Sequence, residues 1–262
     1  MTENCNLRCS HCYMSAGPRK KETTTSSENF QKMLEHLPDN DTRMVLTGGE
    51  IFTVEDSLRD YLELIKSENN TRKKSDSIRV LLQTNGFWLN GRNAEKLLSY
   101  LKEMDVTELD VSSYDRRHAQ QGLRLKQYVK GLVLEYFPKS GFRGVDAAVM
   151  PLGRAKKARK SYSAEYCIGA NKKKKSSVTI RSSGIVSPCC FSLLKYEGNV
   201  FEEPLLDILN RARENPRLQA LNRSGFIGLA KYDKIDFAHL EQLINQFGEC
   251  GACAKIYGQK LR

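Results

Sequence analysis

The feature that most constrains this chain is a group of three cysteines within eight residues near its start, Cys5, Cys9 and Cys12. A compact loop of this kind can surround one face of a cubane iron–sulfur cluster, with each thiolate binding one iron. Because such a cluster normally takes four thiolates, three would leave one iron open to an outside ligand. A fragment of a zinc site is the alternative, although zinc fingers favour two well-separated pairs of ligands. The spacing therefore favours an iron–sulfur site with one open position.

A second group of cysteines indicates a second metal site. The chain shows no secretory signal, so we expect a cytoplasmic protein, in which thiols bind metals or act in catalysis rather than form disulfides. A long stretch without cysteine separates the two groups, unlike an evenly cross-linked disulfide scaffold. The second group comprises Cys167, Cys189, Cys190, Cys250 and Cys253.

Strand-like and helix-like segments alternate through the first two thirds of the chain. Apolar spacing predicts helices at 27–36, 54–67, 93–103 and 125–136, and short apolar runs predict strands at 44–46, 78–82, 109–111 and 145–150. Such alternation implies parallel strands with right-handed crossovers. We therefore expect an α/β fold, a partial (β/α) TIM-like barrel.

Polar or glycine-rich segments follow four of the predicted strands: 47–50, 84–86, 112–115 and 151–154. In parallel α/β folds the chemistry lies at the carboxyl ends of the strands. Four segments in phase predict one active-site rim.

The pattern changes after residue 162, where a β-hairpin is expected at 178–187 with its turn at Ser182-Ser183-Gly184. Helices are expected at 204–214 and 237–247, and the Cys250-Gly-Ala-Cys253 pair follows them. We place a domain boundary near Ser161, so that residues 1–161 form the barrel domain and 162–262 a small α+β domain.

The formal net charge of +11 is partly concentrated in basic runs at 154–160 and 172–175. Nucleic-acid binding is one interpretation, but neither run is interleaved with aromatic residues that could stack on bases. The two basic runs could equally be solvated loops. They could also attract an acidic substrate or a peptide with an acidic leader. No apolar stretch is long enough to span a membrane.

The cysteine spacing, followed by Tyr13 and later by Thr47-Gly48-Gly49-Glu50, resembles the radical S-adenosylmethionine (radical SAM) superfamily. The resemblance implies that Cys5, Cys9 and Cys12 bind a [4Fe-4S] cluster whose open iron is chelated by SAM. Reductive cleavage of SAM would give a 5′-deoxyadenosyl radical that abstracts a hydrogen atom from the substrate. A separate electron donor such as flavodoxin or ferredoxin is implied.

The resemblance also implies which residues bind SAM. Gly48, Gly49 and Glu50 would contact its methionyl amino group, since glycines permit close backbone approach and a carboxylate balances an ammonium. Asn85 and Ser113, at the next strand ends, are suited to hydrogen bonding with the carboxylate or ribose of SAM. Tyr13 is likewise expected to bind SAM. For Asn85-Gly86 an ordinary turn is the alternative.

The second half resembles the auxiliary-cluster domain of many radical SAM enzymes, in its shorter "twitch" form related to the SPASM domain. The resemblance implies that four cysteines hold an auxiliary [4Fe-4S] cluster, so that the chain would carry two. Zinc is the alternative metal. The implied ligands are Cys167, Cys189, Cys250 and Cys253.

Pro188-Cys189-Cys190 leaves Cys190 as a spare thiol and resembles the radical SAM peptide epimerases. There the enzyme removes an α-hydrogen from an L-residue, and the spare cysteine returns one from the other face. A ribosomally made peptide is the implied substrate. Alternatively, Cys190 could be an unreactive thiol that only packs against its neighbours.

Asp115 and His118 lie beyond the end of the third predicted strand. They form either a substrate site or a pair of surface residues.

Two departures from the family pattern concern the barrel. The cluster loop begins at Cys5, so the strand that normally leads into it is absent, and either the chain is truncated or Met1 is an internal start. The stretch between Asp115 and Met150 has room for little more than one helix, so an inner strand is also expected to be absent.

Two other functions remain open. The same machinery could cross-link or oxidise a peptide or a small molecule. A zinc- or cluster-stabilised nucleic-acid-binding module would leave the Gly48-Gly49-Glu50 segment without a purpose.

Overall fold

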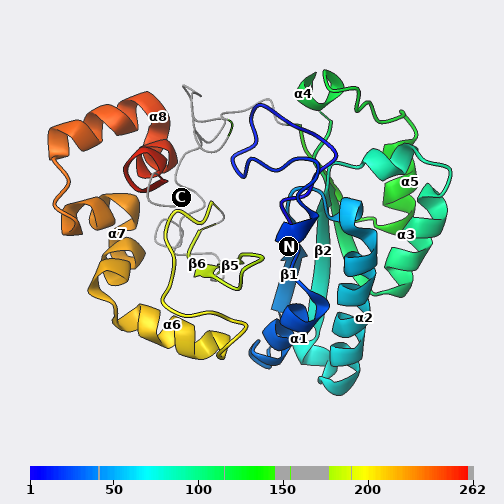
Figure 1. The fold of residues 1–262 in the computed structure, drawn as a ribbon, viewed down its shortest axis with the longest axis horizontal. Helices are drawn as coiled ribbons and strands as arrows, with labels where there is room; N and C mark the ends of the chain where they lie inside the picture. The colour runs from blue at the N-terminus through cyan, green and yellow to red at the C-terminus, as the bar shows by residue number, and fades with distance from the viewer. Residues whose placement is uncertain (41, 115, 145–153, 155–176, 190, 259–262) are drawn as a thin grey trace. The chain divides into compact units, whose positions relative to one another are not determined.

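The computed structural model describes residues 1–40, 42–114, 116–144, 154, 177–189 and 191–258 (Figure 1). The chain forms two compact units. The first comprises Met1–Cys9, Ala16–Leu34 and Asp39–Ala147, and the second comprises Ser10–Ser15, Glu35–Pro38 and Ala148–Arg262. The three-cysteine loop is therefore divided, with Cys5 and Cys9 in the first unit and Cys12 in the second. The boundary expected near Ser161 lies outside the described residues.

The first unit contains a four-stranded parallel sheet in the order β1-β2-β3-β4. Its strands are β1 (Thr42–Leu46), β2 (Ile78–Thr84), β3 (Val106–Val111) and β4 (Gly141–Phe142). Neighbours in the sheet are neighbours in the chain, as repeated strand–helix–strand units require. The predicted α/β fold with parallel strands is confirmed.

Helices connect these strands, and Figure 1 shows α2, α3 and α5 along the same side of the sheet. The α-helices are α1 (Ser27–Glu35), α2 (Glu55–Thr71), α3 (Ala94–Glu103), α4 (Arg116–Ala119) and α5 (Val129–Tyr136). Short 3-10 turns are η1 (Lys21–Thr23), η2 (Ile51–Val54), η3 (Lys74–Asp76) and η4 (Phe87–Asn90). The first three predicted helices are present with ends shifted by a few residues.

The third strand is followed by more structure than the sequence predicted. The helix expected at 125–136 begins only at Val129, and the short α4 precedes it. The β4 strand lies just before the strand expected at 145–150, which itself falls outside the described residues.

Apolar burial explains why the sheet forms where it does. Strand β2 buries Ile78, Val80, Leu81 and Leu82, a run typical of a strand that is covered on both faces. The helices contribute matching apolar positions at helical spacing, among them Leu62 in α2, which is fully buried.

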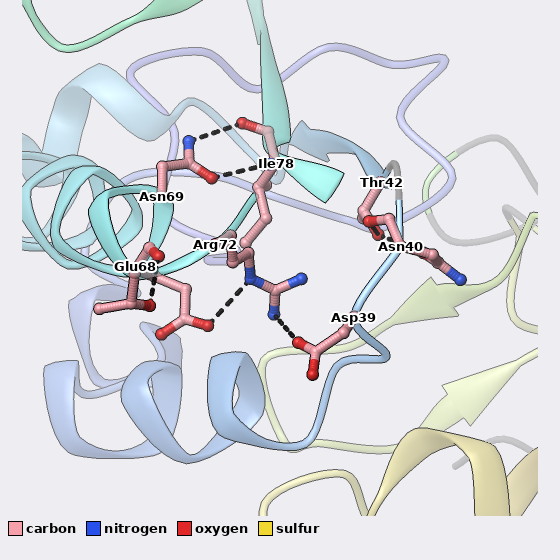
Figure 2. Close-up of polar contacts among 8 residues, drawn as sticks. Asp39, Asn40, Thr42, Glu68, Asn69, Arg72 and Ile78 are labelled. Carbon is pink, nitrogen blue, oxygen red and sulfur yellow. Dashed lines mark hydrogen bonds and ion pairs between the residues drawn. The ribbon is translucent and has the colours of Figure 1, made fainter. Parts of the chain in front are cut away.

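Polar side chains form hydrogen bonds and an ion pair at the amino end of the sheet (Figure 2). Asn69, near the end of α2, exchanges two hydrogen bonds with the backbone of Ile78: the Ile78 N–H donates to Oδ1 at 2.7 Å and Nδ2 donates to the carbonyl at 3.0 Å. Arg72 donates to Glu68 at 2.9 Å and lies 3.7 Å from a carboxylate oxygen of Asp39. The Arg72 side chain is only 4% exposed. These contacts fix where β2 begins.

The second unit contains the predicted hairpin, formed by β5 (Thr179–Ile180) and β6 (Val186–Ser187) paired antiparallel. Gly184 has φ +80° at its turn, a conformation that favours glycine. The helix α6 (Leu205–Glu214) matches the prediction.

The helix α7 (Pro216–Tyr232) was not predicted, and α8 (Phe237–Tyr257) is longer than the predicted 237–247. Gly248, with φ +72°, interrupts α8 just past the predicted end, and helical structure then resumes. Cys250 and Cys253 therefore lie on a helix, which corrects the expectation that they follow one. Apolar side chains of α7 and α8, including Leu229 and Leu240, pack in one core.

In the part of the chain that the structure describes, no helix combines the length and the apolar character needed to cross a bilayer.

Candidate functional site

Polar side chains gather at the carboxyl ends of β1, β2 and β3, as the sequence predicted. Glu50 follows β1 and is fully buried. Its carboxylate accepts hydrogen bonds from the Thr84 hydroxyl at 2.9 Å, from the Asn85 N–H at 2.5 Å and from the Phe52 N–H at 3.2 Å. The Ser113 hydroxyl, after β3, donates to the carbonyl of Asn85. Glu50 thus ties the end of β1 to the end of β2.

Burial raises the pKa of the Glu50 carboxyl to about 7. The hydrogen bonds from Asn85, Thr84 and Phe52, and the charge of His118, favour the ionised form but do not offset the loss of hydration. A perturbed carboxyl in this position is a candidate functional group because it can hold or release a proton near neutral pH.

Gly48 and Gly49 let the start of the chain approach the end of β1. The Gly49 N–H donates to the carbonyl of Thr2 at 2.7 Å, and the Glu50 N–H donates to that of Asn4 at 2.8 Å. A β-carbon at Gly48 would collide with Thr2, and one at Gly49 with the carbonyl oxygen of Asn4. The two glycines therefore permit backbone-to-backbone contact that delivers Cys5 to the sheet end.

Cys5 is buried beside the end of β2. Its sulfur accepts a hydrogen bond from the Leu7 N–H at 3.4 Å, and Asn85 Nδ2 lies 3.9 Å from it. The same Asn85 amide donates to Asn6 Oδ1 at 2.8 Å. Asn85 also forms the turn considered as its alternative role, since its Oδ1 accepts from the Phe87 N–H at 3.0 Å and Gly86 has φ +77°.

Cys9 is buried near α4. A ring nitrogen of His118 lies within 4.8 Å of its sulfur, and Gln121 Nε2 lies 3.1 Å from it. His118 is 5% exposed, so it is not a surface residue. Its predicted partner Asp115 falls outside the described residues. Gln121 was missed by the sequence reasoning, since nothing in its neighbourhood distinguishes one polar residue from the next.

In the second unit, three of the cysteines predicted to hold the auxiliary cluster come together. Cys189, Cys250 and Cys253 all pack around Leu193 and Ala254. The predicted ligand Cys167 and the spare Cys190 lie outside the described residues.

Tyr13 belongs to this same group in the second unit. Its ring meets that of Phe191 edge-on, with centroids 5.0 Å apart. The structure thus places Tyr13 beside the cysteines of the auxiliary group. The sequence suggests Tyr13 as a SAM-binding residue and gives no sign of this position.

The donor set fits iron–sulfur clusters. The structure describes six cysteines, and none of them forms a disulfide with another described residue: Cys5, Cys9, Cys12, Cys189, Cys250 and Cys253. Thiolates are the usual ligands of such clusters, and hydrogen bonds to their sulfurs, like those at Cys5 and Cys9, are a common means of adjusting them.

Comparison with protein families identifies the class. Residues 1–156 match the model of the radical SAM superfamily, and residues 167–254 match SPASM, an iron–sulfur cluster-binding domain. The chain therefore belongs to the radical SAM superfamily and uses SAM and [4Fe-4S] clusters.

One relative is the antilisterial bacteriocin subtilosin biosynthesis protein AlbA of Bacillus subtilis (strain 168), which is 34% identical over 107 residues. The aligned stretch makes up 40% of this chain and only 22% of that protein.

Solved structures of anSMEcpe share the fold. The native protein with bound AdoMet and Cp18Cys peptide is 17% identical with a TM-score of 0.52, over 83% of this chain and 79% of that one. A histidine-tagged form with bound AdoMet is 14% identical with a TM-score of 0.53, over 97% of this chain and 96% of that one. The similarity supports a partial barrel followed by a C-terminal domain.

Proposed function

We propose that this chain is a radical SAM enzyme that modifies a ribosomally made peptide, with epimerisation of an L-residue as its reaction. SAM bound at a [4Fe-4S] cluster would supply a 5′-deoxyadenosyl radical able to abstract a hydrogen atom from carbon. The observation that carries the proposal lies at the carboxyl end of the sheet: Asn85 contacts both Cys5 and Glu50, and His118 lies near Cys9 while its charge acts on Glu50.

The proposed roles combine that placement with the cysteine spacing in the sequence. Cys5, Cys9 and Cys12 hold the catalytic cluster. Glu50, with Gly48 and Gly49, would bind the methionyl amino group of SAM, because a carboxylate and an ammonium each favour the charged form of the other. Asn85 and Ser113 complete the polar lining at the next two strand ends. His118, which lies near Cys9, supports the charge of the Glu50 carboxylate, and it remains a candidate for the substrate site.

A peptide substrate is supported by the relative named for subtilosin biosynthesis. The second unit would hold the auxiliary cluster through Cys189, Cys250 and Cys253, which lie together, and through Cys167. Electrons for the catalytic cluster would come from a small carrier such as flavodoxin or ferredoxin.

Epimerisation itself is supported by the Pro188-Cys189-Cys190 sequence, in which Cys190 is not needed as a ligand. After the α-hydrogen is removed, the Cys190 S–H bond breaks and its hydrogen atom bonds to the opposite face of the α-carbon. The sulfur radical that remains must then take up an electron from the carrier and a proton from water. Cross-linking or oxidation would need no such donor.

The test runs the reaction in deuterated water with a precursor peptide and compares wild type with Cys190→Ala. A thiol hydrogen exchanges with solvent, so wild type should give a D-residue carrying one solvent deuterium. The Cys190→Ala variant should still cleave SAM but give no D-residue. Cys12→Ala is the matched control and should lose SAM cleavage as well. D-product at the wild-type rate from Cys190→Ala would contradict the donor role.

A further inference from the structure

Gln121 joins the end of α4 to the cysteine loop through both ends of its amide. Its Oε1 accepts a hydrogen bond from the Arg8 N–H at 3.0 Å, and its Nε2 lies 3.1 Å from the Cys9 sulfur. Because a backbone N–H can only donate, the amide oxygen must face Arg8. The amide NH2 group must then face the sulfur, and it donates a hydrogen bond to Cys9.

The backbone around Gln121 holds this amide in place. The carbonyl of His118 accepts from the Gln121 N–H at 3.0 Å and from the Leu123 N–H at 3.2 Å. Gly122 has φ +81°, which lets the chain turn sharply between them. His118 and Leu123 are buried on either side. Gln121 itself is largely exposed, so its side chain can be replaced without opening the core.

We propose that Gln121 is a positioning residue that fixes the Cys9 loop and raises the reduction potential of the catalytic cluster. The inference rests on the proposed role of Cys9 as a cluster ligand. A donor to a ligating sulfur withdraws negative charge, which favours the reduced and more negative state of the cluster. The bond to Arg8 acts on the geometry of the loop, and the bond to Cys9 acts on the electronics of the ligand.

Two substitutions separate these roles. Gln121→Glu keeps an oxygen that can accept from Arg8 but replaces the donor to Cys9 with a second acceptor. Gln121→Met keeps the length of the side chain and loses both bonds. Gln120→Glu is the matched control, because it adds the same charge one residue away on an exposed side chain.

The first measurement is a redox titration of the reconstituted full chain. The reduced catalytic cluster is monitored by electron paramagnetic resonance, at the signal that changes when SAM is added. At a fixed potential, the ratio of reduced to oxidised cluster should fall about threefold in Gln121→Met and about tenfold in Gln121→Glu. Gln120→Glu should stay within about twofold of wild type. The electronic role is wrong if the cluster of Gln121→Met has the same reduction potential as that of wild type. It is also wrong if the cluster of Gln121→Glu has the same potential as that of Gln120→Glu.

The second measurement is hydrogen exchange of the Arg8 amide in the cluster-free chain. Exchange should be about tenfold faster in Gln121→Met and unchanged in Gln121→Glu. Unchanged exchange in Gln121→Met would overturn the positioning role. If wild type assembled no SAM-responsive cluster, the ligand role of Cys9 would fail and the electronic role with it, while Arg8 exchange would still decide the positioning role.

Discussion

The two ends of the parallel sheet use polar residues in different ways. At the amino end, Asn69 satisfies the backbone of Ile78, and Arg72 is shared between carboxylates on either side of it (Figure 2). At the carboxyl end, Glu50 is fully buried against neutral donors, and its pKa is raised to about 7. The amino end matches charge with opposite charge, whereas the carboxyl end holds a carboxyl in an environment that opposes its charge.

This difference supports the proposal that the carboxyl end of the sheet carries the function. A network whose charges are paired stabilises the fold and offers little to a ligand. A buried carboxyl with a raised pKa costs stability at neutral pH, and here it accepts a hydrogen bond from Asn85, which lies beside Cys5. Substitutions at the two ends should therefore separate stability from activity.

The largest effect is expected at Gly49, where the chain start meets the end of β1. In Gly49→Ala the new methyl group would collide with the carbonyl of Asn4, so the free energy of unfolding should fall by about 3 kcal/mol. Gly131→Ala is the matched control: nothing lies within 4 Å of a β-carbon there, and α5 should gain up to about 1 kcal/mol. Anaerobic urea unfolding checks both, and equal stabilities would contradict the backbone contact.

The next effect is the pH dependence that Glu50 imparts. Its folded pKa lies above the unfolded value, so the folded state binds the proton more tightly and the group's contribution to stability is present at low pH. That contribution should be lost as the pH rises through 7. The stability of wild type relative to Glu50→Gln should therefore fall by about 2 kcal/mol between pH 5 and pH 8. Parallel stability curves for the two proteins would show that burial does not perturb this carboxyl.

The smallest effect is expected at the amino end. Asn69→Ala removes two hydrogen bonds to Ile78 and should lower the free energy of unfolding by about 1 to 2 kcal/mol. Exposed Asn70→Ala should change it by less than about 0.5 kcal/mol. SAM cleavage per assembled cluster should match wild type in both. A loss of cleavage in Asn69→Ala beyond its loss of folded protein would contradict the division between the two ends.

Much of this arrangement could be predicted from the sequence because it depends on local pattern. The apolar run at Ile78–Leu82 requires a buried strand, and the polar segments after successive strands meet at one edge of a parallel sheet. The cysteine spacing by itself indicates an iron–sulfur cluster. Glu50 at a strand end was anticipated, but not that three donors from Phe52, Thr84 and Asn85 surround it.

Other features depended on tertiary contacts that a linear pattern does not carry. Gln121 contacts Cys9 although 112 positions separate them in the chain. The helix α7 was missed because Gly225 and Gly228 weaken its helical pattern, and Gly248 made the helix before Cys250 seem to end there. In both helices a glycine with positive φ, Gly225 or Gly248, does interrupt the helical backbone, and helical structure resumes beyond it. Apolar side chains on both sides of these interruptions pack in one core.

The most direct test of the account is electron paramagnetic resonance of the reduced, reconstituted chain with and without SAM, compared between wild type and Cys5→Ala. If the three cysteines leave one iron open at the carboxyl end of the sheet, SAM should shift the wild-type signal, and Cys5→Ala should lose that SAM-responsive signal while keeping the auxiliary one. A wild-type signal that SAM leaves unchanged, or zinc found in place of iron, would contradict the assignment of the carboxyl end as the catalytic site.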